Sequence, residues 1–293
     1  MIVSIGEPMV EFTQLEAKNF LQGFGGDTSN MIIAAARSGA RTAYLTRVGD
    51  DEFGRMLLEL WKREGVDTSH VIIDRNAPTG AYFVTHGPNG HVFSYLRTGS
   101  AASRLSPSDL PDLAEASVVH ASGISMAISP SACDTVFHAF QKSKGKMSFD
   151  SNLRLKLWPL GRARETIARA AGMADYFFPS LEDARELSGK QSPEENLEWA
   201  HGLGAKTVFL KLGADGVIVS DGKREQHISG LKVKAVDATG AGDCFCGAAL
   251  ARLEAGDTIW EAARYANAAA ALATTGFGAV DPLPRADAVR SLM

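Results

Sequence analysis

Short apolar runs alternate with longer amphipathic stretches along most of this chain. The short runs are rich in β-branched and aromatic residues and several end in glycine, serine or aspartate, which is typical of buried strands that turn into loops. We expect strands at 2–6, 42–49, 117–123, 146–150, 175–180 and 207–213. Between them, apolar positions recur at helical spacing, which predicts helices over 27–39, 51–65, 129–145 and 257–276.

Strands that alternate with helices in this way form a mostly parallel sheet with helices on both faces. Ligands of such sheets bind at the carboxyl ends of the strands. The last predicted helix carries further support, because Thr258 and Glu261 have the spacing of a capping box and Gly276 can end the helix. No repeat or linker interrupts the pattern. We therefore predict the α/β class, with residues 1–293 as a single domain.

The segment 79–99 breaks the alternation. Two β-rich runs flank the turn sequence at 87–90, Gly-Pro-Asn-Gly, and this arrangement predicts a β-hairpin. Residues 8–22 can also be extended. Together, 8–22 and 79–99 are expected to form a small β-sheet that projects from the main body as a lid.

The hairpin also predicts which side chains share a face. A turn across 87–90 pairs even-numbered positions of the first strand with odd-numbered positions of the second. Tyr82 and Val84 then lie on one face, and Tyr95 and Arg97 lie on that same face. Two phenols and a guanidinium suit a polar ligand surface. Packing of the lid, or of an interface between subunits, explains the tyrosines equally well.

Composition and charge exclude several classes of function. The 293 residues carry 30 basic and 34 acidic side chains, a net charge of −4, so no basic surface indicates a nucleic-acid partner. No apolar run approaches the roughly 20 residues of a membrane span, and the first residues lack the basic region of a signal peptide. The three cysteines give neither a disulfide framework nor a metal quartet. We expect a cytoplasmic protein with small-molecule partners, without nucleic acid or membrane.

The strongest chemical signal is a turn of small residues, 240–242, that leads into Asp243 and an apolar helical run. Small residues at a helix N-terminus let an anion approach unpaired backbone amides. A carboxylate at the same place can accept the proton of an alcohol, and phosphoryl transfer needs both. A bare Gly-x-Gly-Asp is more often a helix-capping aspartate after a tight turn. The chain has no Walker A or protein-kinase motif, so any phosphoryl transfer uses another architecture.

Three segments resemble signatures of the ribokinase-like (PfkB) family of carbohydrate kinases. They are GFGGDTSNMIIAAARSGA at 23–40, TRVGDDEFG at 46–54 and DATGAGDCFCGA at 237–248. The resemblance runs in order from Ile2 to about Pro284. It implies a ribokinase-like three-layer α/β/α sandwich with a β-sheet lid, and ATP with Mg²⁺ as the phosphate donor.

Three other segments resemble the 2-keto-3-deoxygluconate kinase branch of that family. They are VHASGISMAIS at 119–129, FDSNLRLKLW at 149–158 and YANAAAALATTGFGAV at 265–280. The substrate of that branch is a sugar acid, and arginine is the side chain best shaped to hold its carboxylate. Arg97 and Arg154 are the candidates, although each alone is more often a surface salt-bridge partner.

The resemblance implies roles for single residues. It implies that Asp243 is the catalytic base and that the amides of Gly240, Ala241 and Gly242 form the anion hole. The sugar-acid site is implied at Gly26, Asn30, Tyr82, Tyr95 and Arg97. Arg154, together with Asn152, is implied to bridge the substrate and the ATP phosphates. The ATP side is implied at Lys211, Gly213, Gly216 and Asn267.

A few positions depart from the family pattern or add to it. Ser180 and Asp183 stand where the family commonly has Asn-x-x-Glu, which leaves open the side chain that orients the water shell of Mg²⁺. Because Mg²⁺ binds mainly through nucleotide phosphates, we assign it no protein ligand. Asp237 resembles a monovalent-cation loop, which implies K⁺ nearby. Cys244 has no histidine close in sequence and is expected to pack inside its helix.

The function we expect is ATP-dependent phosphorylation of the primary hydroxyl of 2-keto-3-deoxygluconate. A fructokinase or another neutral-sugar kinase of the family is the alternative, and preference for an acid over a neutral sugar separates the two. A nucleoside kinase is disfavoured because nothing marks an aromatic base pocket near the lid. A non-catalytic sugar sensor would not need the base. Exposed lid edges can pair between subunits, so we expect a homo-oligomer formed through the lid.

Overall fold

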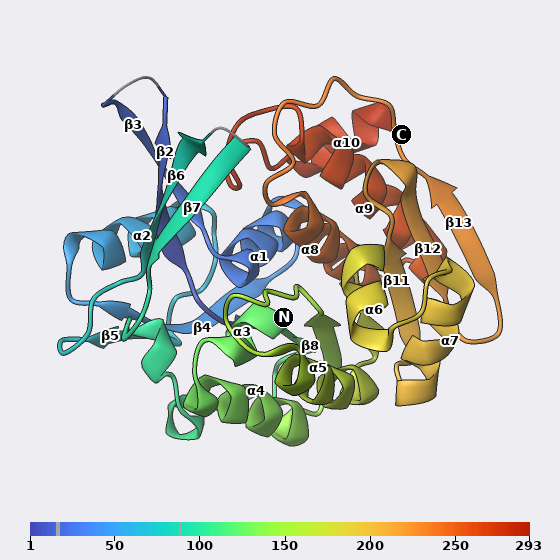
Figure 1. The fold of residues 1–293 in the computed structure, drawn as a ribbon, viewed down its shortest axis with the longest axis horizontal. Helices are drawn as coiled ribbons and strands as arrows, with labels where there is room; N and C mark the ends of the chain where they lie inside the picture. The colour runs from blue at the N-terminus through green and yellow to red at the C-terminus, as the bar shows by residue number, and fades with distance from the viewer. Residues whose placement is uncertain (16–17, 88–89) are drawn as a thin grey trace.

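The structure is a computed structural model that describes residues 1–15, 18–87 and 90–293. A large sheet crosses the molecule with helices on both faces, and a small sheet projects to one side (Figure 1). Positions 16–17 of the expected lid and positions 88–89 of its turn lie outside the described residues. No helix of the described chain is both long enough and apolar enough to cross a membrane.

The large sheet has nine strands in the order β13-β12-β11-β10-β9-β8-β1-β4-β5. Their bounds are β1 Ile2–Ile5, β4 Thr42–Gly49, β5 Val71–Asp74, β8 Val118–Ser122, β9 Lys146–Asp150, β10 Tyr176–Phe177, β11 Thr207–Lys211, β12 Gly216–Ser220 and β13 Glu225–Ser229. The pairs β11-β12 and β12-β13 are antiparallel and the other neighbours are parallel. This confirms the mostly parallel sheet expected from the sequence.

One strand is shorter than its apolar pattern predicts. The pattern favours 175–180, but β10 covers only Tyr176–Phe177. Pro179 has no amide hydrogen to donate to a neighbouring strand. Ser180 then serves as the N-cap of the next helix, where its side chain accepts a hydrogen bond from the Asp183 amide. The apolar run continues past the strand, and single backbone hydrogen bonds remain there, from the Phe178 amide to the Phe149 carbonyl and from the Lys211 amide to the Pro179 carbonyl, but the regular strand ends at Phe177.

Helices cover the sheet in two layers, because alternate residues of each strand face opposite sides. Ile2 packs with one core cluster, whereas Val3 and Ile5 pack with the other. On the first face lie α1 Asp27–Arg37, α2 Glu52–Arg63, α8 Ala241–Glu254, α9 Ile259–Ala273 and α10 Ala286–Leu292. On the second lie α3 Gly123–Ala127, α4 Pro130–Lys142, α5 Leu160–Met173, α6 Leu181–Ser188 and α7 Pro193–Leu203. The result is the predicted three-layer α/β/α sandwich. The capping box of Thr258 and Glu261 is present at the start of α9.

Helices α1 and α8 lie against each other, and a glycine makes this approach possible. A Cβ at Gly247 would stand 2.2 Å from the carbonyl oxygen of Met31, closer than any real side chain can approach. Both helices begin within two turns before this contact, at Asp27 and Ala241. The close packing therefore brings the N-termini of α1 and α8 to the same place.

The small sheet has the order β3-β2-β6-β7, with β2 Met9–Gln14, β3 Phe20–Gly25, β6 Ala81–Gly87 and β7 Gly90–Leu96. Tyr82 pairs with Tyr95, which confirms the predicted hairpin and a shared face for these two phenols, whereas Arg97 follows the end of β7. Glu11 of β2 lies beside Tyr82 in the register. β3 continues to Gly25, three residues beyond the expected segment, and leads directly into α1. We call this four-stranded sheet the lid.

Candidate active site

Asp243 lies in the first turn of α8 but does not cap it. Gly240 is the N-cap, and no side-chain capping bond is found there. The Oδ2 atom of Asp243 instead accepts a hydrogen bond of 2.8 Å from Nδ2 of Asn30 on α1. The helix-capping interpretation of this aspartate is therefore excluded. The carboxylate is held across the junction of two helix N-termini.

The surroundings of Asp243 raise its pKa to about 8. Burial among protein atoms is the main cause, and the negative charge of Asp27 adds to it, with a smaller effect of Asp150. The hydrogen bond from Asn30 acts in the opposite direction because it stabilises the charged form. A carboxylate with a pKa in this range is a stronger base than an ordinary aspartate.

The turn before Asp243 requires glycine at its first position. Gly240 has φ 76°, and a Cβ there would stand 2.9 Å from the carbonyl oxygen of Ala279. The amide of Ala241 donates to the carbonyl of Ala238 at 3.2 Å, so this member of the expected anion hole is already bonded. No hydrogen bond from the amides of Gly242 or Asp243 is found within the described chain. These two amides are the ones that remain for an anion.

A positive charge lies beside this turn. Lys211, at the end of β11, places its Nζ atom 3.6 Å from where a Cβ of Gly242 would be. The same Nζ donates to Oδ2 of Asp150 at 2.7 Å. Burial lowers the pKa of this lysine, but the Asp150 carboxylate more than offsets that effect and the net shift is upward, so the ammonium stays charged. A lysine that ends a strand is usually solvated, whereas this one is largely buried and is held by the buried Asp150 next to the anion-binding turn.

Asp150 connects this lysine to the loop that follows β9. Its Oδ2 also accepts from Sγ of Cys246, at 3.2 Å, and its Oδ1 accepts from the amide of Asn152, at 3.2 Å. Asn152 has φ 28°, the one positive value among the described residues other than glycine. Its Nδ2 donates to Oδ2 of Asp27 at 2.7 Å. The loop is thereby tied both to Lys211 and to the start of α1.

Ser180 and Asp183 stand where the family commonly has Asn-x-x-Glu, and each has a different structural role. Ser180 caps α6. Oδ2 of Asp183 accepts from the hydroxyl of Ser151 at 2.7 Å and from the amide of Leu153 at 3.0 Å. Burial raises the pKa of Asp183, and these hydrogen bonds act against that rise. The acid thus fixes the loop that carries Asn152. No group of three or more His, Cys, Asp or Glu side chains in the described residues could hold a metal ion.

The lid presents acids as well as phenols to the body of the protein. The Tyr82 hydroxyl donates to Oε2 of Glu11, and burial is the main reason that the pKa of this phenol is raised. Gly25 leaves the space that the Tyr82 ring fills, because a Cβ there would stand 2.4 Å from its hydroxyl. Tyr95 is 41% exposed. The sequence analysis did not anticipate that Tyr82 would be almost fully buried against an acid.

Arg97 is held by a buried carboxylate that sequence reasoning missed. Its Nη2 donates to Oε2 of Glu7, whose Oε1 accepts from the hydroxyl of Ser100 at 3.2 Å. The guanidinium lies 5.4 Å from the ring centroid of Tyr95. Its Nε is buried and has no hydrogen-bond partner within the described chain. Gly26, with φ 98°, packs on the same segment, since a Cβ there would stand 2.2 Å from the Glu7 carbonyl oxygen.

A cavity of about 630 Å³ opens beside the anion-binding turn. It lies between the turn that joins β11 to β12, the segment 230–238, the first turns of α8 and the last turns of α9. The four residues implied at the ATP side line it, together with Gly242 of the expected anion hole: Lys211, Gly213, Gly216, Asn267 and Gly242. Apolar atoms such as the Phe245 side chain form much of its wall. The dimensions and the mixture of apolar wall and polar groups are typical of a site for a ligand of nucleotide size.

Two assigned residues make contacts other than those expected of a phosphate or nucleotide ligand. Asn267 lines the cavity, but its Nδ2 donates to the carbonyl of Ser229 at 2.8 Å and so holds the end of β13. Arg154 is exposed, and its Nη1 donates to the neighbouring carbonyl of Leu153 at 2.8 Å. Neither Arg154 nor Asn152 lines the cavity of about 630 Å³.

The loop around Asp237 is closely bonded. Oδ1 of Asp237 accepts from the amide of Thr239 at 2.9 Å and from its hydroxyl at 2.6 Å. Oδ2 accepts from the amide of Gly278 at 3.0 Å. One carboxylate therefore joins the segment before α8 to the segment after α9. Cys244 is buried inside α8, as expected, and burial raises the pKa of its thiol.

Three acids of the site were not predicted from the sequence: Glu7, Asp27 and Asp150. Asp150 ends a predicted strand, and Glu7 directly follows another one. Because the carboxyl ends of parallel strands meet at one edge of a sheet, these positions could have predicted that both acids lie at the ligand site. Asp27 stands in the first turn of a predicted helix after two glycines, where an acid more often serves only to stabilise the helix.

Comparisons with known proteins place these features in a family. A family model described as pfkB family carbohydrate kinase matches residues 1–286. The 2-dehydro-3-deoxygluconokinase of Thermoproteus tenax is 36% identical over 97% of this chain and 91% of its own length. Fructokinase-2 of Solanum habrochaites is 33% identical over 100% of this chain and 96% of its own length.

Solved structures agree with the fold. A putative ribokinase II from E. coli in complex with ATP and Mg²⁺ has a TM-score of 0.91 at 27% identity, covering 99% of this chain and 97% of that one. A fructokinase double mutant from Vibrio cholerae O395, bound to fructose, ADP and potassium ion, has a TM-score of 0.90 at 32% identity, with the same shares covered.

Proposed function

This chain belongs to the pfkB family of carbohydrate kinases and is an ATP-dependent sugar kinase, and we propose that its acceptor is the sugar acid 2-keto-3-deoxygluconate. The observation that carries the catalytic part is the Asp243 carboxylate, held by Asn30 at 2.8 Å beside a largely buried lysine and two amides that have no hydrogen bond within the described chain. These groups supply the base and the positive field that phosphoryl transfer to an alcohol requires.

In the proposed reaction, the oxygen of the primary hydroxyl attacks the γ-phosphorus of ATP and the bond to the bridging oxygen of ADP breaks. Asp243 takes the hydroxyl proton. The amides of Gly242 and Asp243 and the ammonium of Lys211 lie where they can stabilise charge on the transferred group. The Oδ1 atom of Asn30 is buried without a partner among the described residues, and it can accept a hydrogen bond from a second sugar hydroxyl.

The acid substrate is supported by Arg97 and by the relatives. Glu7 and the Tyr95 ring fix the Arg97 guanidinium, and its Nε–H stays unpaired within the described chain. A guanidinium fixed in this way can bind a carboxylate with little loss of conformational freedom. The relative at 36% identity is a 2-dehydro-3-deoxygluconokinase, which is another name for 2-keto-3-deoxygluconate kinase.

Fructokinase is the second candidate. Fructokinase-2 of Solanum habrochaites is 33% identical over the whole chain, and the matching Vibrio cholerae structure contains fructose. A neutral ketose would leave the charge of Arg97 paired only with Glu7. Preference between an acid and a neutral sugar therefore separates the two candidates.

Mg²⁺ and K⁺ are part of the proposal. When bound, Mg²⁺ neutralises charge on the ATP phosphates. No set of three or more acidic, His or Cys side chains in the described chain suits a metal, so we assign Mg²⁺ to the nucleotide. The Asp237 carboxylate, which joins two loops next to the anion-binding turn, is the group we propose to lie near K⁺. A potassium ion is present in the matching fructokinase.

We also propose a homo-oligomer formed through the lid. In the described part of the chain, β7 has one edge without a neighbouring strand, and Leu21, Phe93 and Leu96 on the lid are exposed. An open edge with apolar side chains suits pairing with a second copy. Size-exclusion chromatography with light scattering should give a multiple of the 31.2 kDa chain. A Phe93→Asp variant should shift that mass towards the monomer, and a monomeric wild type would contradict the proposal.

The substrate is tested by ADP release with MgATP and one acceptor at a time: 2-keto-3-deoxygluconate, fructose, ribose and adenosine. We expect strong turnover with the sugar acid. Arg97→Ala should raise its KM at least tenfold, consistent with the loss of a charge-assisted contact, and should change the KM for fructose little. Preferred turnover of fructose would move the chain to the second candidate. Equal effects of Arg97→Ala on both sugars would reject the carboxylate role of Arg97.

A further inference from the structure

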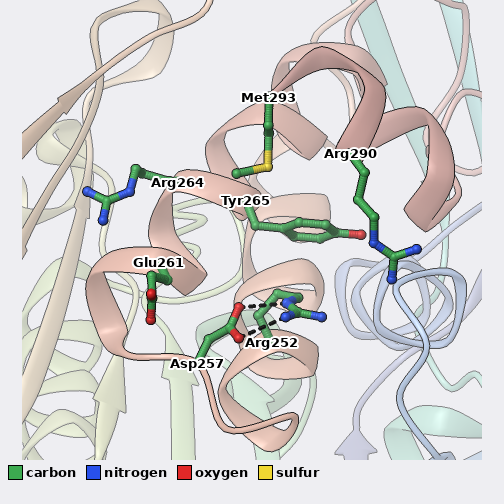
Figure 2. A pocket seen from close by; sticks show the side chains of 7 residues that line it. All are labelled: Arg252, Asp257, Glu261, Arg264, Tyr265, Arg290 and Met293. Atoms are coloured by element: carbon green, nitrogen blue, oxygen red, sulfur yellow. Dashed lines mark hydrogen bonds and ion pairs between the residues drawn. The ribbon is translucent and has the colours of Figure 1, made fainter.

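A second pocket lies at the opposite end of α8 from Asp243. It is formed by the end of α8, the first turns of α9 and the end of α10, and has a volume of about 260 Å³ (Figure 2). Arg252 lies nine positions after Asp243, which corresponds to a rise of about 14 Å along a helix. The proposed kinase reaction makes no use of this pocket.

The two acids that line the pocket are already engaged. Asp257 binds Arg252 in a bidentate ion pair, in which Nε donates to Oδ2 at 2.7 Å and Nη2 donates to Oδ1 at 2.8 Å. Glu261 accepts from the amide and hydroxyl of Thr258 at 2.9 and 2.6 Å as part of the α9 capping box. These contacts leave Nη1 of Arg252 without a hydrogen-bond partner in the described chain, so its N–H groups can bind a further acceptor.

Tyr265 provides the observation that points to a ligand. Only 5% of this residue is exposed, and its hydroxyl has no hydrogen-bond partner within the described chain. Its ring lies 5.5 Å from the Arg252 guanidinium carbon. In Figure 2, the hydroxyl points to the side on which Arg290 extends, whereas the Arg264 guanidinium points the other way. A buried hydroxyl without a partner is unfavourable, and an entering acceptor would relieve it.

We propose that this pocket binds a small phosphate-bearing anion through the Tyr265 hydroxyl and the guanidinium groups of Arg290 and Arg252. All three groups offer hydrogen-bond donors, so the matching ligand is an acceptor with negative charge. The planar guanidinium fork suits phosphate oxygens, and the cavity has room for a phosphate ester with a short carbon chain. Arg290 is bonded to Asp287 only through an exposed pair on α10, so it can turn towards a ligand at small cost.

Isothermal titration calorimetry tests the proposal with inorganic phosphate and with glycerol 3-phosphate as separate probes. A saturating non-hydrolysable ATP analogue and Mg²⁺ are present throughout, so that the anion-binding turn at Gly242 is occupied. We expect saturable binding of at least one probe. Tighter binding of glycerol 3-phosphate would identify an ester as the ligand, and tighter binding of inorganic phosphate would identify the free ion.

The variants are Tyr265→Phe and Arg290→Ala, and Arg264→Ala is the matched control. Tyr265→Phe removes no hydrogen bond of the free protein, so it should keep the fold. We expect each of the first two variants to bind the probe at least tenfold more weakly, and Arg264→Ala to stay within about twofold of the wild type. Absence of saturable binding by the wild type, or unchanged binding by Tyr265→Phe, would overturn the proposal. Equal losses in Arg264→Ala and Arg290→Ala would overturn it as well, because they would indicate only a general effect of positive charge.

Discussion

The raised pKa of Asp243 predicts how kinase activity depends on pH. The base must be ionised to accept the hydroxyl proton, so kcat/KM for the sugar acid should rise with pH through the pKa of Asp243, which is about 8. With that value, about a tenth of the protein is ionised at pH 7 and about nine-tenths at pH 9. Activity should therefore rise about tenfold from pH 7 to pH 9 and level off above that.

Two variants identify the titrating group, because they alter its surroundings without altering the substrates. Asp27→Asn removes the neighbouring negative charge that contributes to the raised pKa, so the midpoint should move to lower pH. Asn30→Ala removes the hydrogen bond that stabilises the carboxylate, so the midpoint should move to higher pH. The opposite directions are the diagnostic result.

The assay is quenched ADP formation, quantified by chromatography at saturating MgATP and low sugar acid from pH 6 to pH 10. A direct assay avoids coupling enzymes that would titrate themselves. A profile that is flat over this range would refute the role of Asp243 as a base with a raised pKa. Identical midpoints in wild type and both variants would refute the assignment of the midpoint to Asp243.

Three further predictions concern the turn, the lysine and the cation. Gly240→Ala should lower both the melting temperature and kcat, since it adds about 1–2 kcal/mol of left-handed strain and a backbone clash. Gly256 also has a left-handed backbone, with φ 98°, but open space around it. Gly256→Ala should therefore lower the melting temperature but leave kcat unchanged. Equal kcat values in the two variants would contradict this. Lys211→Met leaves Asp150 buried without its ion-pair partner and should lower the free energy of unfolding in urea by about 3–5 kcal/mol. Lys206 is exposed, so Lys206→Met should lower it by no more than about 1 kcal/mol. Similar losses in the two variants would contradict a greater contribution of the Lys211–Asp150 pair to stability. Replacing K⁺ by choline should lower kcat in steady-state assays, and an unchanged rate would remove the cation from the proposal.

The order of elements could be predicted from the sequence because each strand and helix has its own apolar pattern. The hairpin also followed from local signals, since a turn between two glycines fixes which residues pair. β10 was predicted too long because Phe178 continues the apolar run although Pro179 has no amide hydrogen to donate to a neighbouring strand. Side-chain burial and backbone pairing are separate properties, and periodicity reports only the first.

The candidate site could be predicted in part. The glycine turn and Asp243 are adjacent in sequence, so their motif is visible. The contacts that set the chemistry join distant residues: Asn30 with Asp243 is separated by 213 positions, and Arg97 with Glu7 by 90. A carboxylate that is buried opposite an arginine has no local pattern to distinguish it from a solvated one. The fold supplies these pairs, and only the structure reveals them.

The most direct test of the catalytic account compares wild type with Asp243→Asn in ADP formation from MgATP and 2-keto-3-deoxygluconate. The amide keeps the size of the side chain and its place at the start of α8, but it cannot take the hydroxyl proton. The account predicts that kcat falls by about 10²–10⁴ while KM for the sugar acid changes little and thermal unfolding shows an intact fold. Near-wild-type turnover in Asp243→Asn would contradict it.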